Sequence, residues 1–279
     1  MSSELVRLRQ EKNLKQETVA RALDWSPSKL IRIEGGSVGI STTDLQALLR
    51  QYGVDDGSPL MAHLIELARG ARERGWWSSY SRELSSDPAY LAFLGYEYGA
   101  SRIKHFGLAV MPALLQTEDY ARALTRQYVS EERAEMLVTV RMLRQEKLLE
   151  RDPPPEQAFV LDEAVIRRRV GRRVDLKIMP NQLKHLLELQ ATRPYLTIQV
   201  IPFDVGAHFG MTGNFAVLEF EGALGPVLYL ENSRGGALTV TGRDPEIVNY
   251  NSAFETLRET ALSPEASREL IERVIAEMG

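Results

Sequence analysis

Three polar side chains, Ser28, Lys29 and Arg32, lie at helical spacing on a short segment whose neighbouring positions are largely apolar. Ser28 and Arg32 are four residues apart and share one helix face, while Lys29 lies to the side. A guanidinium group can form a bidentate pair with the edge of a guanine base, and an ammonium group binds phosphate. These residues therefore predict a surface that contacts double-stranded DNA, with Arg32 on a base and Lys29 on the backbone.

Apolar residues at three- and four-residue spacing predict two short helices between residues 15 and 34. The residues on these apolar faces are Val19, Ala20 and Leu23 in the first helix and Leu30 and Ile33 in the second. Ala20 is small at the position where two helices must cross closely. The pattern indicates a helix-turn-helix. A plain helical hairpin is the alternative, since any helical bundle has apolar residues at these spacings.

The turn and the helix starts carry suitable residues. Asp24 stands where the chain must turn sharply, and Asp tolerates the left-handed backbone conformation better than most residues. Ser26 can cap the second helix, and Pro27 suits its first position. Gln16 begins the first helix, where its amide and the helix N-terminus can approach a phosphate. We expect Ser26 to touch the DNA backbone as well.

The segment resembles the DNA-binding domain of the XRE family of Cro and phage repressors over roughly the first quarter of the chain. Shared features include Gln at the start of the first helix, Ala in its middle, Trp25 after the turn and Ile33-Glu34-Gly35 at the end. Asp24 departs from the Gly or small residue usual in the turn. The resemblance implies that Arg9, on a preceding helix, pairs with Glu34. Because one short helix contacts few bases, we also expect a homodimer that binds two half-sites.

The rest of the sequence contains no recognisable catalytic or metal-binding motif. Its four histidines lack metal-ligand spacing to one another, and there is no P-loop, dinucleotide-binding glycine motif or H-E-x-x-H motif. Residues 35–39 match the G-x-S-x-G hydrolase motif, but a predicted helix precedes them instead of a strand, so we interpret them as a helix end and loop. We predict no enzyme, no catalytic residue, no cofactor and no metal.

A few residues remain as candidates for a partner or ligand site, namely Trp76, Trp77, His208, Glu231 and Arg234. The two tryptophans begin an aromatic-rich region, and such a cluster usually belongs to a core or an interface. His208 follows a predicted strand between two glycines, and a loop histidine without a partner is usually exposed. Glu231 and Arg234 belong to a polar loop at a strand end, which could shape a groove for a ligand or peptide.

Composition limits the class of protein. The chain has 279 residues, a net charge of −4 and no cysteine, so disulfides and thiolate metal sites are excluded. The N-terminus lacks the basic head and apolar run of a signal peptide, and no apolar stretch is long enough to cross a bilayer. We expect a soluble cytoplasmic protein without membrane contact. The acidic balance also predicts modest non-specific affinity for DNA, and hence dependence on dimerisation.

The chain divides into two predicted domains. Residues 1–70 form a mainly α-helical helix-turn-helix domain, and residues 71–279 form a larger α+β domain with a helical first half and a small sheet. We expect helices throughout residues 76–150, including one over 90–103 and one over 130–150. A mixed region follows over 156–279. Its expected strands are 158–161, 196–201, 214–220 and 227–230, and its expected helices are 162–170, 181–191, 245–261 and 264–278.

Four further segments, in this order, carry a second resemblance that covers nearly the whole chain: residues 113–124, 159–164, 198–208 and 227–231. They resemble the C-terminal domain of actinobacterial antitoxin-like helix-turn-helix regulators. Pro112-Ala113 stands where that pattern usually has Pro-Gly. The resemblance implies a transcriptional regulator whose larger domain dimerises and binds a small partner protein encoded nearby, or an effector. The alternatives are an interaction module that no longer binds DNA and an enzyme housed in the larger domain.

Overall fold

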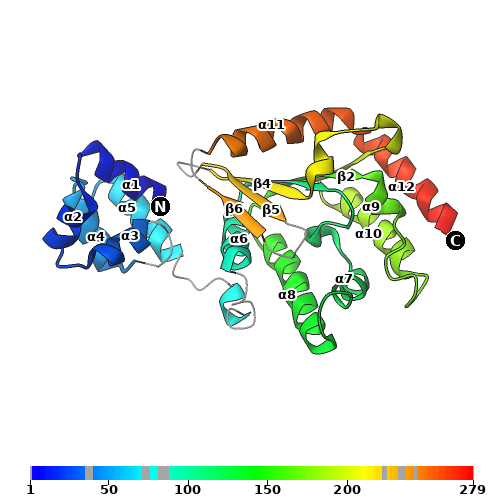
Figure 1. Ribbon diagram of the computed structural model, residues 1–279, viewed down its shortest axis with the longest axis horizontal. Helices are drawn as coiled ribbons and strands as arrows, with labels where there is room; N and C mark the ends of the chain where they lie inside the picture. Colours follow the sequence, from blue (N-terminus) through cyan, green and yellow to red (C-terminus); the bar gives the residue numbers. More distant parts are fainter. Residues whose placement is uncertain are drawn as a thin grey trace. The chain divides into compact units, whose positions relative to one another are not determined.

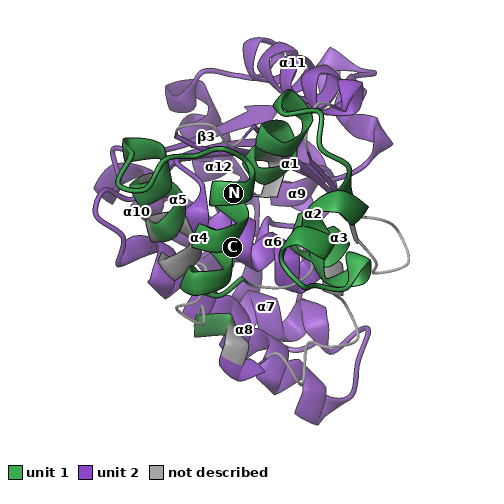
Figure 2. Ribbon diagram, turned by 90° about the vertical axis from the view of Figure 1, so that its left-hand side faces the viewer, with its two compact units in different colours: residues 1–78, 222–224 green, residues 79–221, 225–279 purple. Residues whose placement is uncertain are grey.

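The computed structural model describes residues 2–34, 40–70, 76–80, 88–221, 225–231, 237–241 and 244–278. The chain forms two compact units, residues 1–78 and residues 79–221 with 225–279 (Figure 2). The predicted boundary near Gly70 therefore lies inside unit 1, which also includes Trp76 and Trp77. Among the described helices, none is long and apolar enough to cross a membrane.

Unit 1 is a small helical domain. Its described elements are α1 (Ser2–Glu11), α2 (Gln16–Ala22), α3 (Pro27–Glu34), α4 (Thr42–Gln51) and α5 (Pro59–Gly70), and the short 3-10 helix η1 (Trp76–Tyr80) spans the boundary with unit 2. One hydrophobic core joins the first five helices. It includes all the apolar positions expected in the helix-turn-helix, with Val19, Ala20, Leu30 and Ile33 buried and Leu23 packed at the edge. The mainly helical N-terminal domain is confirmed.

Unit 2 is built on one mixed sheet of six strands in the order β3-β2-β1-β4-β5-β6. The strands are β1 (Arg102–Gly107), β2 (Glu156–Asp162), β3 (Leu196–Ile201), β4 (Phe215–Glu219), β5 (Val227–Glu231) and β6 (Ala237–Val240). β1, β2 and β3 are parallel, whereas β4, β5 and β6 continue the sheet in antiparallel pairs. Parallel neighbours need crossover connections, which helices supply here.

Helices cover both faces of this sheet (Figure 1). They are α6 (Pro88–Gly99), α7 (Glu118–Thr125), α8 (Glu131–Leu149), α9 (Glu163–Arg167), α10 (Ile178–Thr192), α11 (Pro245–Thr260) and α12 (Pro264–Met278), with short 3-10 helices η2 (Ala113–Leu115), η3 (Phe203–Val205) and η4 (Phe209–Thr212). The larger core lies between the sheet and α6, α7, α10 and α12, and a second core lies under α11. The α+β fold class is confirmed.

Strand β1 corrects the expectation that residues 76–150 are helical and that a helix extends over 90–103. Helix α6 ends at Gly99, and β1 then lies at the centre of the sheet. Residues 103–107 are all buried, although Lys104 and His105 are polar. Three ionisable residues among its six positions, Arg102, Lys104 and His105, hide the strand, because buried strands are normally recognised by continuous apolar residues. The short strand β6 also lay outside the predicted elements.

Lys104 and His105 are accommodated in different ways. The Lys104 ammonium donates to Glu219 at 2.7 Å and Asn251 at 2.8 Å and pairs with Glu255 at 2.9 Å. The His105 ring lies 5.9 Å from the Phe159 ring, and its Nδ1 atom is buried without a hydrogen-bond partner. Burial, with a smaller contribution from Arg144, lowers the pKa of His105 to about 3. The side chain is therefore neutral in the folded protein at all ordinary pH values.

The buried His105 makes stability pH-dependent. The unfolded chain takes up a proton near pH 6.5 and the folded chain only near pH 3, so stability falls as the pH decreases between these values. From pH 6.5 to about pH 5 this residue costs about 2 kcal/mol of unfolding free energy. We expect His105→Leu to remove that part of the acid sensitivity, measured by urea unfolding with far-UV circular dichroism. An unchanged difference between neutral and acidic stability in the variant would contradict the assignment.

Candidate nucleic-acid interface

The helix-turn-helix has the geometry that its residues predict. Asp24 adopts a left-handed backbone with a φ of 55°, and the Trp25 N–H donates to the Ala20 carbonyl at 2.8 Å. The Ser26 hydroxyl accepts from the Lys29 N–H at 3.2 Å and so caps α3. Pro27 is the first residue of α3. The turn and the cap thus fix where α3 starts, which sets the direction of its side chains.

One face of α3 is left exposed. Ser28 and Arg32 lie on it together, and the Arg32 Nε–H donates to the Ser28 carbonyl at 3.3 Å. Ile31 is also exposed, at 52%, which sequence analysis missed although its position one residue from buried Leu30 places it off the apolar face. An exposed aliphatic side chain beside an arginine can contact a thymine methyl group. The exposed face of α3 therefore combines hydrogen-bonding and apolar groups.

Lys29 is less free than predicted. Its ammonium lies 3.0 Å from an Asp44 carboxylate oxygen and 4.0 Å from the centre of the Trp25 ring. Both partners are on the protein surface, where an ion pair contributes at most about 1 kcal/mol. Phosphate can therefore compete with Asp44 for Lys29, but the pair reduces the positive charge that α3 presents.

The carboxylate of Glu34, the last residue of α3, is a buried junction between four helices. Arg9 of α1 donates to it through Nε at 2.8 and 3.0 Å, so the predicted Arg9–Glu34 pair is confirmed. Gln16, the first residue of α2, donates its amide at 2.8 Å. The hydroxyl of Tyr52, which follows α4, donates as well. The roles of Gln16 and Tyr52 in this network were not predicted.

The protonation states of the network follow from its contacts. Burial raises the pKa of Glu34, but the hydrogen bonds from Arg9, Tyr52 and Gln16 outweigh it, so the pKa lies below its usual value. Burial and the bond to Glu34 raise the pKa of Tyr52 above its usual value. Glu34 is therefore a carboxylate and Tyr52 a neutral donor. Three donors from three different segments converge on one charged acceptor.

The other predicted site residues are distributed over the two units or lie outside the described residues. Trp76 and Trp77 pack edge to face, 5.8 Å apart, in the part of η1 that belongs to unit 1. Arg234 lies outside the described residues, as do Gly35 to Gly39. Glu231 is the last residue of β5 in unit 2. The sequence therefore indicated these positions individually, without identifying a common site.

His208 differs from the exposed loop histidine that was expected. Its side chain is only 7% exposed, its Nε2 lies 3.1 Å from an Asp162 oxygen, and its ring packs edge-on against Phe106. The other ring nitrogen, Nδ1, is buried without a partner. Neither ring nitrogen faces solvent or a nucleophile. His208 therefore holds its own loop against the end of β2, where Asp162 lies.

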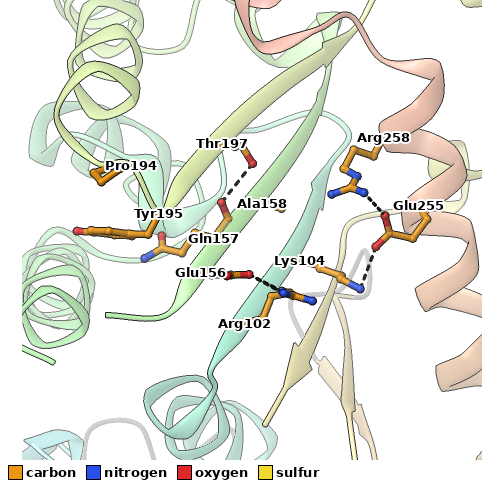
Figure 3. A pocket seen from close by; sticks show the side chains of 10 residues that line it. All are labelled: Arg102, Lys104, Glu156, Gln157, Ala158, Pro194, Tyr195, Thr197, Glu255 and Arg258. Carbon is orange, nitrogen blue, oxygen red and sulfur yellow. Dashed lines mark hydrogen bonds and ion pairs between the residues drawn. The ribbon is translucent and has the colours of Figure 1, made fainter. Parts of the chain in front are cut away.

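A polar pocket of about 780 Å³ lies on the sheet face beside α11 (Figure 3). Each of its charged side chains is paired: Arg102 with Glu156, and both Lys104 and Arg258 with Glu255. The volume is within the range of small-molecule sites. Among the described residues, however, no group of three or more histidine, aspartate or glutamate side chains could hold a metal ion. Because the charged side chains of the pocket are already paired, they do not indicate a particular ligand.

Removing the Glu34 carboxylate should destabilise unit 1 strongly. Glu34→Ala leaves the partly buried Arg9 guanidinium and the buried Tyr52 hydroxyl without their acceptor, and breaking a largely buried pair in this way costs up to about 3–5 kcal/mol. Tyr52→Phe removes one donor and should cost only about 1 kcal/mol. All three tryptophans of the chain, at positions 25, 76 and 77, lie in unit 1, so tryptophan fluorescence during urea unfolding reports on this unit. Equal losses in the two variants would contradict a central role for Glu34.

Comparison with protein-family models gives two matches. Residues 1–64 match a helix-turn-helix domain, which supports a DNA-binding regulator. Residues 90–273 match a domain of unknown function (DUF5753). No curated protein matches the chain, and no solved structure matches it either. Since the second match covers more than half of the sequence, the chain belongs to the family of this domain of unknown function, with a helix-turn-helix domain preceding it.

Proposed function

We propose that the protein is a sequence-specific transcriptional regulator of the XRE type that places α3 in the major groove of DNA. The observation that carries the proposal is the exposed face of Ser28, Ile31 and Arg32 on a helix whose end is fixed by Glu34. A recognition helix must be held rigidly, because base contacts require side chains to be placed within hydrogen-bonding distance. The match of residues 1–64 to a helix-turn-helix domain supports the same conclusion.

The proposed contacts divide into two kinds. Arg32 forms a bidentate pair with guanine, while Ser28 and Ile31 contact neighbouring base edges. Ser26, Lys29 and Gln16 bind phosphates and set the register of the protein on the duplex. Gln16 can still bind a phosphate, because its amide nitrogen carries two hydrogens and one of them is sufficient for the bond to Glu34.

We propose further that the larger unit mediates homodimerisation and binds a small partner protein, in the manner of an antitoxin-like regulator in the cytoplasm. The support is the resemblance of residues 113–124, 159–164, 198–208 and 227–231 to such regulators. The low charge of the exposed α3 face fits this arrangement. A single unit of a chain with a net charge of −4 binds non-specific DNA weakly, so two linked units are needed for useful affinity.

Substitution of Arg32 should change specificity. Arg32→Ala is expected to lower the preference for operator over random duplex by roughly 1–3 kcal/mol. Lys29→Ala should weaken both duplexes together and reduce the salt slope by about 1. Fluorescence anisotropy with the native promoter fragment and a random duplex, over a range of salt concentrations, measures both quantities.

Arg50→Ala is the matched control for these variants. Arg50 is an exposed residue of α4 that pairs with Asp56, so the substitution removes one positive charge from unit 1 outside α3. It should leave the specificity ratio and the salt slope close to those of the unsubstituted protein. If Arg32→Ala leaves the ratio of specific to random binding unchanged, recognition by this face of α3 is wrong.

The protein should be a dimer when it binds DNA. Dimers of this motif contact half-sites about 34–36 Å apart, so the operator should consist of two similar half-sites at this spacing. Analytical ultracentrifugation at micromolar concentration, alone and with operator duplex, measures the stoichiometry. A monomer in solution together with one protein molecule on each duplex would contradict the proposal.

A further inference from the structure

The loop between α9 and α10 is the most basic segment of unit 2. Residues 168–177 contain Arg168, Arg169, Arg172, Arg173 and Lys177, against one acidic residue, Asp175. The whole chain has a net charge of −4, so this concentration of positive charge is local. Residues 172–177 are all exposed. The loop is the yellow-green segment that joins the two helices in Figure 1.

The loop is held in a defined conformation. Gly171 has a φ of 76°, and the Ile178 side chain fills the space against it, since a Cβ there would lie 2.7 Å from Ile178. The Gly171 carbonyl accepts from the Val174 N–H at 2.8 Å, and the Asp175 carboxylate accepts from the Lys177 N–H at 2.9 Å. The loop therefore presents its side chains without a large ordering cost when it binds a partner.

Three of its cations, Arg172, Arg173 and Lys177, form no ion pair with another described residue. Arg168 and Arg169 donate to the carbonyls of Ala109 and Glu277. In contrast, no hydrogen bond or ion pair engages the side chains of Arg172, Arg173 and Lys177 within the described part of the chain. Most other exposed arginines of unit 2, such as Arg268, pair with a nearby carboxylate. Arg172 and Arg173 can therefore bind carboxylates of another molecule without first breaking a pair.

A small pocket with both cationic and apolar side chains in its wall lies directly beside these arginines. Its volume is about 190 Å³, and it is lined by Arg169 and Arg172 together with the apolar residues Val170, Leu176, Met179, Pro180 and Met278. This is below the roughly 300–1,000 Å³ of sites for drug-sized molecules, and it suits one apolar side chain. Val174 and Leu176 add further apolar surface, being 70% and 67% exposed. Apolar and cationic groups thus meet at one place.

We propose that this surface, formed by residues 169–180 and Met278, binds an acidic segment of a partner protein. One apolar side chain of that segment enters the pocket, and adjacent Asp or Glu residues pair with Arg172 and Arg173. This rests on the proposed function, in which the larger unit binds a small protein, and it names the chemistry that the partner must have. Nucleic acid fits less well, because a phosphate group makes no favourable apolar contact with the aliphatic side chains of the pocket or with Val174 and Leu176.

The proposal can be tested without knowing the partner. The full chain is used to select binders from a random peptide library by messenger-RNA display, and selected peptides are then measured by fluorescence anisotropy. We expect the selected peptides to carry an apolar residue next to acidic residues. Arg172→Ala with Arg173→Ala should weaken their binding at least tenfold at low salt. Leu176→Ser should also weaken binding, independently of charge.

The matched control is Lys184→Ala with Arg268→Ala, which removes the same charge from exposed positions on α10 and α12. It should change peptide affinity less than twofold. Failure to select acidic peptides, or equal affinity for the loop variant and the control, would overturn the proposal. So would a result in which the loop variant lowers binding to a random duplex but leaves peptide binding unchanged. Arg32→Ala should not affect peptide binding, so failure of the α3 proposal is recognised separately.

Discussion

The buried carboxylate of Glu34 is the interaction on which the proposed DNA-contacting surface depends. Helix α3 has eight residues, which is too few for a helix that is stable by itself in water. Its apolar side attaches through Leu30 and Ile33, but apolar contacts alone do not fix the rotation and tilt of a short helix. Glu34 accepts from α1, from the start of α2 and from the residue after α4. These directional bonds set the orientation of α3, and the exposed positions of Ser28 and Arg32 follow from it.

Unit 2 uses buried charge in a comparable way. Glu97 of α6 and Arg144 of α8 are both almost completely buried and form an ion pair, while the Arg144 guanidinium lies 5.1 Å from the centre of the Phe93 ring. Phe93 in turn stacks on Tyr229 of β5, with 3.8 Å between the ring centres. A buried pair adds little net stability compared with apolar residues of the same volume, yet removing one partner is costly. The pair therefore acts mainly to specify which faces of α6 and α8 meet over the sheet.

Sequence patterns predicted the elements whose apolar residues follow a clear period. The two helices around Asp24, strand Leu196–Ile201 and helix Pro264–Met278 were placed correctly, and so was the pair of Arg9 with Glu34. Strand β1 could not be predicted, because the buried ammonium group of Lys104 is stabilised by three partners from β4 and α11 that are distant in sequence. The same reason applies to His208, whose partner Asp162 lies 46 residues earlier. Ionisable residues become buried only when the tertiary structure supplies their partners, and no local pattern reveals those partners.

The distribution of cations suggests how the two units could be coupled. In unit 1, Lys29 is paired with Asp44 and Arg9 with Glu34, so neither side chain can bind a phosphate without giving up an ion pair. In unit 2, Arg172 and Arg173 have no side-chain partner among the residues that the structure describes, and they lie in a loop beside a small pocket. Weak DNA affinity makes a regulator sensitive to small changes in its dimerisation or its conformation. If a partner bound to the basic loop changes the affinity for DNA by some factor, thermodynamic reciprocity requires DNA to change the affinity for the partner by the same factor. The affinity of the acidic partner with and without operator DNA therefore reports the same coupling as the affinity for DNA with and without the partner.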